Sequence, residues 1–190
     1  MEQKAALRSR LRSARSDRDP AELDRAGIQL ARVGLVRCRG LSSVAAYAGV
    51  GNEPPTRPLL DALVEAGVAV WLPRVTPDGL EWARYDGWAA LRERQGLLEP
   101  AGESDPQMAM SEFDVVLAPA LAVDRVGNRL GRGGGYFDRA LADVWRDRIV
   151  AVVFADEVLD VVPAEAHDVL VGAALTPDGL VELPRPAEGL

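Results

Sequence analysis

The apolar positions of this chain repeat with the two spacings that helices and strands require. Apolar residues three and four positions apart are typical of amphipathic helices. They predict helices over residues 4–18, 19–33, 56–64 and 136–146. Short apolar runs between them are typical of buried strands. These runs cover residues 43–48, 68–72, 80–85, 114–117 and 149–154.

Two further apolar runs close the chain, at residues 169–175 and 180–183, on either side of a Thr-Pro-Asp-Gly turn. Such an arrangement predicts an antiparallel hairpin. The alternation of strands and helices before it predicts an α/β fold with a parallel sheet that is mixed at its edge. With 190 residues, the chain 1–190 is expected to form a single domain.

Composition narrows the possible partners. The chain is 48% hydrophobic and 27% charged, as in ordinary globular proteins, and its net charge is −7. We therefore expect no nucleic-acid partner, although a local basic site could still take an anion. The N-terminus has no apolar signal segment and no run reaches the length of a membrane span, so a cytoplasmic location without membrane contact is expected.

Cysteine and tryptophan are expected to serve the core. Cys38 is the one cysteine, which excludes an intrachain disulfide and a paired-cysteine zinc site. We interpret it as a small buried residue. The four tryptophans Trp71, Trp82, Trp88 and Trp145 are likewise expected in the core rather than at a ligand.

Lys4 is the single lysine among 22 Lys and Arg residues. It begins a basic stripe along the first predicted helix, which continues through Arg8, Arg12 and Arg15. Such a stripe is either a solvated face or an anion contact. A compact ammonium group suits a phosphate, and composition drift is the alternative explanation for the lysine.

The segment Leu117–Arg139 carries the clearest chemical signal. It leaves a predicted strand, passes through Gly131, Gly133, Gly134 and Gly135, and enters a predicted helix, with Arg129 and Arg132 beside the glycines. Glycines let backbone N–H groups turn toward an anion, and basic residues add charge, so the segment predicts a polyphosphate site. It matches neither the P-loop nor the dinucleotide fingerprint, since Tyr136 stands where the last glycine belongs. A tight strand-to-helix turn is the alternative.

Two aspartates are candidate magnesium ligands. Asp138 follows the glycines, and Asp168 precedes a late predicted strand. Mg²⁺ takes one or two carboxylates together with phosphate oxygens. Asp138 could instead serve only as a helix-dipole partner, and Asp168 as a residue at the strand end. His167, the one histidine, has no nucleophilic serine motif to accompany it and is interpreted as structural.

At NRLGRGGGYFDR, residues 128–139, the sequence resembles the 5-formyltetrahydrofolate cyclo-ligase family. Three further regions agree in order and spacing: Lys4 with Arg8, Glu53-Pro54-Pro55-Thr56, and Leu72–Val75. Val162–Asp168 also looks like the family's late segment, so that the resemblance covers nearly the whole chain. Two positions depart from the pattern: Phe137 replaces a frequent tyrosine, and Gly172 replaces a frequent aspartate.

The resemblance implies a three-layer α/β sandwich and a ligase that forms C–N bonds. It implies ATP and Mg²⁺ as cofactors, a folate substrate and, we expect, a monomer. The residues implied for ATP are Lys4, Arg8, Arg129, Gly131, Arg132, Gly133, Gly134, Gly135, Tyr136 and Phe137. Glu53 and Tyr136 would hold the folate, Asp138 and Asp168 would hold Mg²⁺, and Lys4, Arg132 and Tyr136 would be catalytic.

The implied reaction closes 5-formyltetrahydrofolate to 5,10-methenyltetrahydrofolate, with phosphorylation of the formyl oxygen and attack by N10. Three alternatives remain at this point. A non-catalytic folate-binding protein would need no phosphate site, a relative could act on another small molecule, and a sugar-phosphate isomerase of similar fold would need no ATP. The pocket around Glu53 and the stretch 82–112 would distinguish a relative with another substrate.

Overall fold

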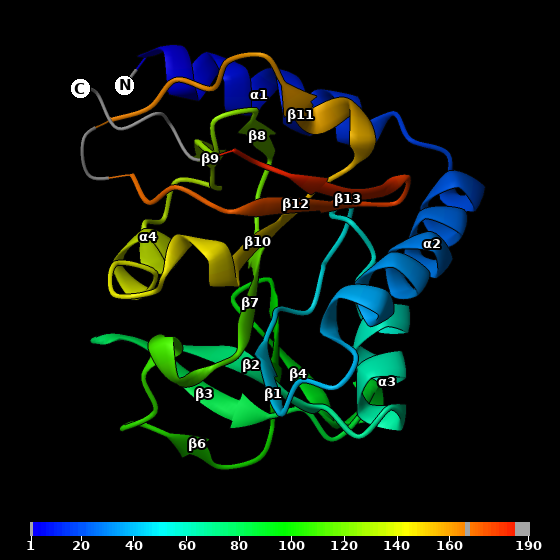
Figure 1. Cartoon of the computed structure of the whole chain (residues 1–190), viewed down its shortest axis with the longest axis vertical. Helices are drawn as coiled ribbons and strands as arrows, with labels where there is room; N and C mark the ends of the chain where they lie inside the picture. The colour runs from blue at the N-terminus through cyan, green and yellow to red at the C-terminus, as the bar shows by residue number, and fades with distance from the viewer. Residues whose placement is uncertain (1, 166–167, 185–190) are drawn as a thin grey trace.

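The computed structural model describes residues 2–165 and 168–184, and its centre is one eight-stranded sheet (Figure 1). The strand order is β13-β12-β10-β7-β1-β2-β3-β6. These strands are β1 Ser43–Ala45, β2 Ala69–Thr76, β3 Gly79–Arg84, β6 Ser104–Asp105, β7 Val115–Pro119, β10 Ile149–Val152, β12 Ala173–Thr176 and β13 Gly179–Glu182. The helices are α1 Glu2–Ser16, α2 Pro20–Cys38, α3 Arg57–Glu65 and α4 Tyr136–Ala140, and short 3₁₀ turns cover Trp88–Ala90, Met110–Glu112, Arg146–Arg148 and Ala155–Glu157.

The five central strands run parallel, and the strands at the edges run antiparallel. β12, β10, β7, β1 and β2 pair in parallel, while β13, β3 and β6 pair antiparallel to their neighbours. The predicted α/β sheet with a mixed edge is confirmed. The predicted closing hairpin is also confirmed, as β12 and β13.

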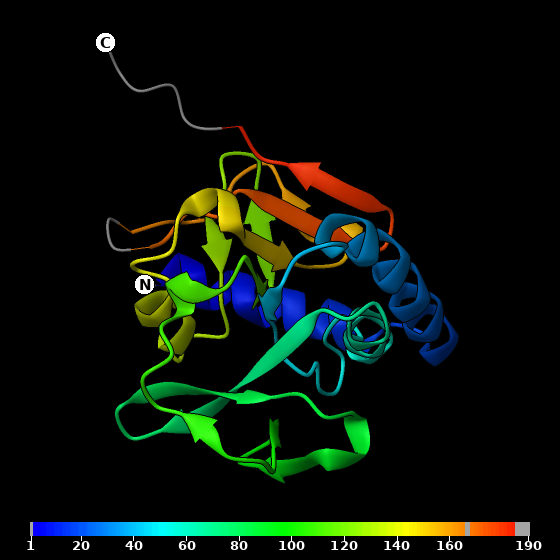
Figure 2. The ribbon, with the colours of Figure 1, turned by 60° about the horizontal axis from the view of Figure 1, so that its bottom comes forward.

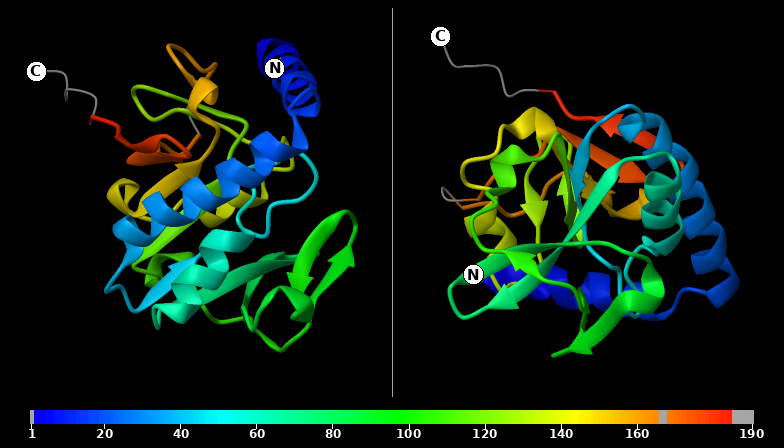
Figure 3. Two further views of the ribbon diagram at one scale, coloured as in Figure 1. Left: turned by 90° about the vertical axis from the view of Figure 1, so that its right-hand side faces the viewer. Right: turned by 90° about the horizontal axis from the view of Figure 1, so that it is seen from below.

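Both faces of the sheet are covered, which gives three layers. Along β7, Val115 and Leu117 face one core and Val116 and Ala118 face the other, as the two-residue period of a strand requires. α2 and α3 lie side by side on the first face (Figure 3). α4 and the turn after it cover the second face through side chains such as Leu141.

A smaller layer lies beyond the carboxyl ends of the parallel strands. Strands β8 Ala122–Asp124, β9 Arg129–Leu130 and β11 Val158–Leu159 form a three-stranded sheet, and α1 packs on it through Leu11. The hairpin of β4 Leu91–Arg94 and β5 Leu97–Pro100 stands apart from the main sheet and packs against β2 through β5 (Figure 2). The sequence had left this hairpin unassigned within a mixed region.

Helix α2 is longer than predicted, because Gly34 does not end it. The helix continues to Cys38. A methyl group on Gly34 would lie 2.6 Å from Cδ1 of Leu59 on α3, so the glycine allows the two helices to approach closely. Glycine lowers helix propensity, and for this reason the predicted helix stopped at Val33, but here Gly34 is a packing position.

The predicted helix 136–146 is wrong in its length. α4 ends at Ala140, and turns then lead to the 3₁₀ turn that begins at Arg146. Leu141 and Val144 still reach the core from this irregular segment. The apolar spacing that suggested a long helix is therefore satisfied by turns.

Several predicted strand ends were also wrong. β1 stops at Ala45, three residues early, whereas β2 continues through Pro73 to Thr76. Proline fits there because β1 pairs only with the first part of β2, as far as Trp71. Thr56 precedes α3 without capping it, since its hydroxyl donates to the carbonyl of Tyr47 at 2.9 Å.

The core position of Cys38 is confirmed, since its side chain is fully buried. The tryptophan prediction holds for Trp82, which is buried, and for Trp71 and Trp88, which pack partly buried against the two cores. It fails for Trp145, which is 76% exposed. No helix among residues 2–165 and 168–184 combines the length and hydrophobicity of a membrane span.

Burial predicts a slow reaction of the Cys38 thiol. It raises the pKa of this thiol to about 11, compared with roughly 8.5 for an unperturbed cysteine. At about pH 8.5 the native protein should react with an aromatic disulfide reagent about 100-fold more slowly than the unfolded chain, because the thiolate is the nucleophile. The same shift predicts that stability falls as the pH rises from about 8.5 to about 11, because only the unfolded chain then ionises. Equal rates for native and unfolded protein would contradict this burial.

Candidate active site

The fold places a crevice where β1 and β7 lie side by side. From β1 the chain crosses to β2 through α3 on one face, and from β7 it crosses to β10 through α4 on the other face. The segments that follow β1 and β7 therefore separate at their carboxyl ends. In open α/β sheets this switch point is the usual place for a ligand.

A cavity of about 150 Å³, here called the first cavity, opens at this point. One wall is apolar and includes Tyr47, Pro73, Leu98 and Pro119. The glycine-rich segment 131–135 and the start of α4 line the cavity as well. A flat heterocycle on the apolar side and an anion on the glycine side would fit this division.

The glycine-rich segment adopts backbone conformations that suit anion binding. Gly133 has φ of 108° and Gly135 has φ of 68°, values that residues with side chains rarely adopt. Cationic side chains surround the segment: a methyl group on Gly133 would lie 3.6 Å from Arg8, and one on Gly135 would lie 3.1 Å from Arg139. The acidic protein therefore carries a local basic site, as the sequence allowed.

Arg129 contacts one of the two predicted magnesium ligands and is influenced by the charge of the other. Its buried guanidinium donates to the carbonyl of Pro119 at 2.9 Å and to the carboxylate of Asp138. Burial lowers the pKa of Arg129, and the charges of Asp138 and Asp168 oppose that effect. Both aspartates therefore lie in the electrostatic neighbourhood of this arginine.

Lys4 lies outside the lining of the first cavity and contacts Asp168. Its ammonium donates to Asp168 at 2.6 Å and to Glu165 at 3.1 Å. Burial opposes the charge of the ammonium, but these two hydrogen bonds outweigh it and raise the pKa of Lys4. The structure thus joins Lys4 to Asp168, one of the predicted metal ligands.

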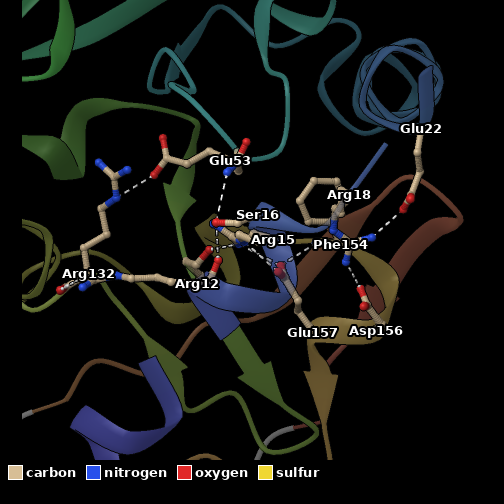
Figure 4. A network of polar contacts seen from close by, with 12 residues as sticks. Arg12, Arg15, Ser16, Arg18, Glu22, Glu53, Arg132, Phe154, Asp156 and Glu157 are labelled. Atoms are coloured by element: carbon tan, nitrogen blue, oxygen red, sulfur yellow. Dashed lines mark hydrogen bonds and ion pairs between the residues drawn. The ribbon is translucent and has the colours of Figure 1, made fainter. Parts of the chain in front are cut away.

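Glu53 lies between two cavities. Its Oε1 is 3.0 Å from Nε of Arg132, and its Oε2 accepts the N–H of Val50 at 3.0 Å. Both Glu53 and Arg132 line the first cavity and also a second, more open cavity of about 370 Å³ that Arg12 and Asn52 help to line. Figure 4 shows this pair, with Arg12 of α1 reaching the backbone of Arg132.

The donor set fits a magnesium ion that is shared with a phosphate ligand. Among residues 2–165 and 168–184, no three His, Cys, Asp or Glu side chains gather as a complete metal site. Asp138 lines the first cavity beside the glycine segment, and Asp168, outside that lining, accepts from Lys4 and acts electrostatically on Arg129. Mg²⁺ bound to phosphates requires no more protein ligands than these.

Most of the predicted site residues do come together. The ones that line the first cavity are Glu53, Arg129, Gly131, Arg132, Gly133, Gly134, Gly135, Tyr136, Phe137 and Asp138. Arg8 reaches the same segment from α1. Lys4 and Asp168 meet each other beyond the lining, and His167 falls outside the described residues. Their roles stay predictions.

Sequence reasoning missed the apolar wall of the first cavity. Tyr47, Leu80, Leu97 and Leu98 line it, and none belongs to a motif that the sequence analysis singled out. Tyr47 is buried, and burial together with the charge of Glu53 raises its pKa well above the usual tyrosine value, so its phenol stays neutral. The sequence did indicate a role for the region of Leu98, because the stretch 82–112 was expected to differ in a relative that acts on another substrate.

The fold and the site define an α/β protein with a basic, glycine-lined ligand pocket at the switch point of its sheet. A profile described as the 5-formyltetrahydrofolate cyclo-ligase family matches residues 1–177. Among named relatives, 5-formyltetrahydrofolate cyclo-ligase of Mycolicibacterium smegmatis is 44% identical over 149 residues, which cover 74% of this chain and 77% of that protein. The protein of the same name from Escherichia coli K12 is 30% identical over 146 residues, with 74% and 80% covered.

Solved structures agree with these sequence relatives. The 5,10-methenyltetrahydrofolate synthetase of Aquifex aeolicus superposes with a TM-score of 0.76 at 25% identity, covering 98% of this chain and 95% of its own. A 5,10-methenyltetrahydrofolate synthetase of Mycoplasma pneumoniae shares the fold, with a TM-score of 0.70, 18% identity, and 90% and 97% covered. This chain belongs to the 5-formyltetrahydrofolate cyclo-ligase family, and the family is one of enzymes.

Proposed function

We propose that this protein is an ATP- and Mg²⁺-dependent 5-formyltetrahydrofolate cyclo-ligase that releases ADP and phosphate. Family membership supports the substrate and the product. The observation that supports the ATP requirement is the first cavity, which is lined both by the glycine segment with Arg132 and by apolar residues. Folate itself carries glutamate carboxylates, so turnover that depends on ATP is what distinguishes the ligase from a protein that only stores folate.

The glycine segment and its arginines would hold the phosphates of ATP. The γ-phosphorus is attacked by the formyl oxygen of the folate, and the bond to ADP breaks. Arg132 would neutralise charge that develops on the transferred group, as phosphoryl transfer requires. Bound Mg²⁺ would supply further charge neutralisation at the phosphates, with Asp138 and Asp168 as its protein ligands.

The second half of the reaction needs positioning more than acid or base strength. Phosphorylation makes the formyl oxygen a good leaving group, so that N10 can attack the formyl carbon and close the five-membered ring. The C–O bond then breaks, phosphate departs with the former formyl oxygen, and N10 loses its proton. Glu53 would hold N–H donors of the pterin, and Tyr136, which lines the cavity at the start of α4, would lie against the folate.

Substrate labelled with ¹⁸O in the formyl group tests this route directly. If the formyl oxygen is phosphorylated, each released phosphate carries one ¹⁸O atom, which mass spectrometry detects. Phosphate without label would show that ATP hydrolysis is separate from ring closure and would overturn the mechanism. Ring closure without ATP would favour a relative with different chemistry.

Glu53→Gln is expected to weaken folate binding selectively. The change keeps the shape of the side chain but removes the charge that a pterin N–H would meet, so KM for the folate should rise about tenfold. Glu65→Gln, an exposed carboxylate on α3, is the matched control and should leave this KM within about twofold. Steady-state kinetics with ATP at saturation measures both. Equal KM values for the two variants would show that the charge of Glu53 does not contribute to folate binding.

A further inference from the structure

Two arginines of α1 donate hydrogen bonds to backbone carbonyls of the glycine segment. Nε of Arg8 donates to the carbonyl of Gly131 at 2.9 Å, and Nη2 of Arg12 donates to the carbonyl of Arg132 at 2.8 Å. Neither Arg8 nor Arg12 lines the first cavity, whereas Gly131 and Arg132 do. Two consecutive loop carbonyls are therefore held by the helix rather than presented to the ligand.

Because the peptide group is planar, the direction of each held carbonyl fixes the direction of the N–H that follows it. In a trans peptide the C=O and the following N–H point in opposite directions. When Arg8 binds the carbonyl of Gly131, the N–H of Arg132 points away from α1. When Arg12 binds the carbonyl of Arg132, the N–H of Gly133 likewise points away from α1. Successive N–H groups on one side of a segment form an anion-binding concavity.

Helix α1 is itself fixed at its other end. Arg15 is 4% exposed, and it donates to both carboxylate oxygens of Glu157, at 2.6 and 2.7 Å. Its Nη2 also donates to the carbonyl of Ala120, directly after β7. Figure 4 shows this pair at the centre of the contacts of α1, with Arg12 extending toward Arg132.

We propose that Arg12 is a positioning residue for phosphate binding: by holding the Arg132 carbonyl, it directs the Gly133 N–H toward the phosphates of ATP. The proposal rests on the proposed function and deepens it, because it assigns a role to a residue that does not line the first cavity. Gly133, with φ of 108°, has the backbone freedom to rotate this N–H away once Arg12 is removed.

Three variants test the role of Arg12. Arg12→Gln removes the guanidinium, Arg12→Lys retains the charge, and Arg10→Gln removes the same charge from an exposed residue of the same helix. For Arg12→Gln, KM for ATP should rise about tenfold, the loss expected for one hydrogen bond to a charged group, with KM for folate within about twofold. Arg12→Lys should recover part of the loss, and Arg10→Gln should match the parent protein.

Amide NMR separates this role from a merely structural one. On addition of MgATP, the Gly133 N–H signal should shift in the parent protein and in Arg10→Gln, and should shift much less in Arg12→Gln. An unchanged shift in Arg12→Gln, or an equal rise of both KM values together with a lower melting temperature, would overturn the positioning role. If the parent protein showed no ATP-dependent turnover, the proposed function would fail instead, so the two failures are distinguishable.

Discussion

Replacing Glu157 by alanine is expected to lower the free energy of unfolding by about 3–5 kcal/mol, the cost of leaving a buried charge without its partner. Arg15 is 4% exposed and Glu157 is 2% exposed, so water cannot replace the lost carboxylate. Glu157 also accepts the N–H of Phe154 at 2.9 Å, and that donor would lose its partner too. Urea unfolding followed by circular dichroism measures the change.

The double variant Arg15→Met with Glu157→Leu is the matched control. Removing both charges avoids the unpaired ion, so its loss of stability should be clearly smaller than that of Glu157→Ala. Asp156→Ala, a neighbouring residue whose side chain is 65% exposed, should cost less than about 1 kcal/mol. A Glu157→Ala variant as stable as Asp156→Ala would show that the buried pair does not anchor α1.

Replacing Lys4 by alanine is expected to lower kcat/KM for ATP by about 100-fold or more, the scale found when a charged group is removed from a phosphoryl-transfer site. Lys4 is the single lysine of the chain and is hydrogen-bonded to Asp168. Its pKa is raised, so the ammonium stays charged throughout the neutral range. No lysine titration should therefore limit the rate between about pH 7 and pH 9.

Two comparisons decide whether this loss reflects phosphate chemistry. Arg10→Ala removes a charge from the exposed side of α1 and should change kcat/KM for ATP by less than about twofold. Lys4→Arg retains a charge in a larger group and should recover only part of the rate. If Lys4→Ala kept full activity and only lost stability, Lys4 would be a structural partner of Asp168.

The sequence predicted the parts of the site that depend on local chemistry. Glycines that follow a buried strand indicated the anion segment, and ten predicted residues do line one cavity. Lys4 and Arg8 were predicted as ATP-binding residues from the basic stripe along the first helix and from the family resemblance. The stripe also contained Arg12 and Arg15, but only the fold shows that Arg12 faces a loop carbonyl and that Arg15 faces Glu157.

The errors arose where tertiary packing overrides local preference. Gly34 weakens an isolated helix, yet in α2 it allows close contact with Leu59. Residues 136–146 have helical apolar spacing, yet Leu141 and Val144 reach the core from turns. The apolar wall at Leu98 comes from a hairpin whose place over the cavity depends on long-range pairing with Ala48. No local pattern contains that information.

The most direct measurement is the near-ultraviolet absorbance of the methenyl product when the purified protein is mixed with 5-formyltetrahydrofolate, ATP and Mg²⁺. The expected result is an absorbance rise that requires both ATP and Mg²⁺, is accompanied by one ADP per ring closed, and is abolished in Lys4→Ala and Asp138→Ala. No rise, with folate binding still detected by calorimetry, would contradict the ligase function and favour a folate-binding protein or a relative with another substrate.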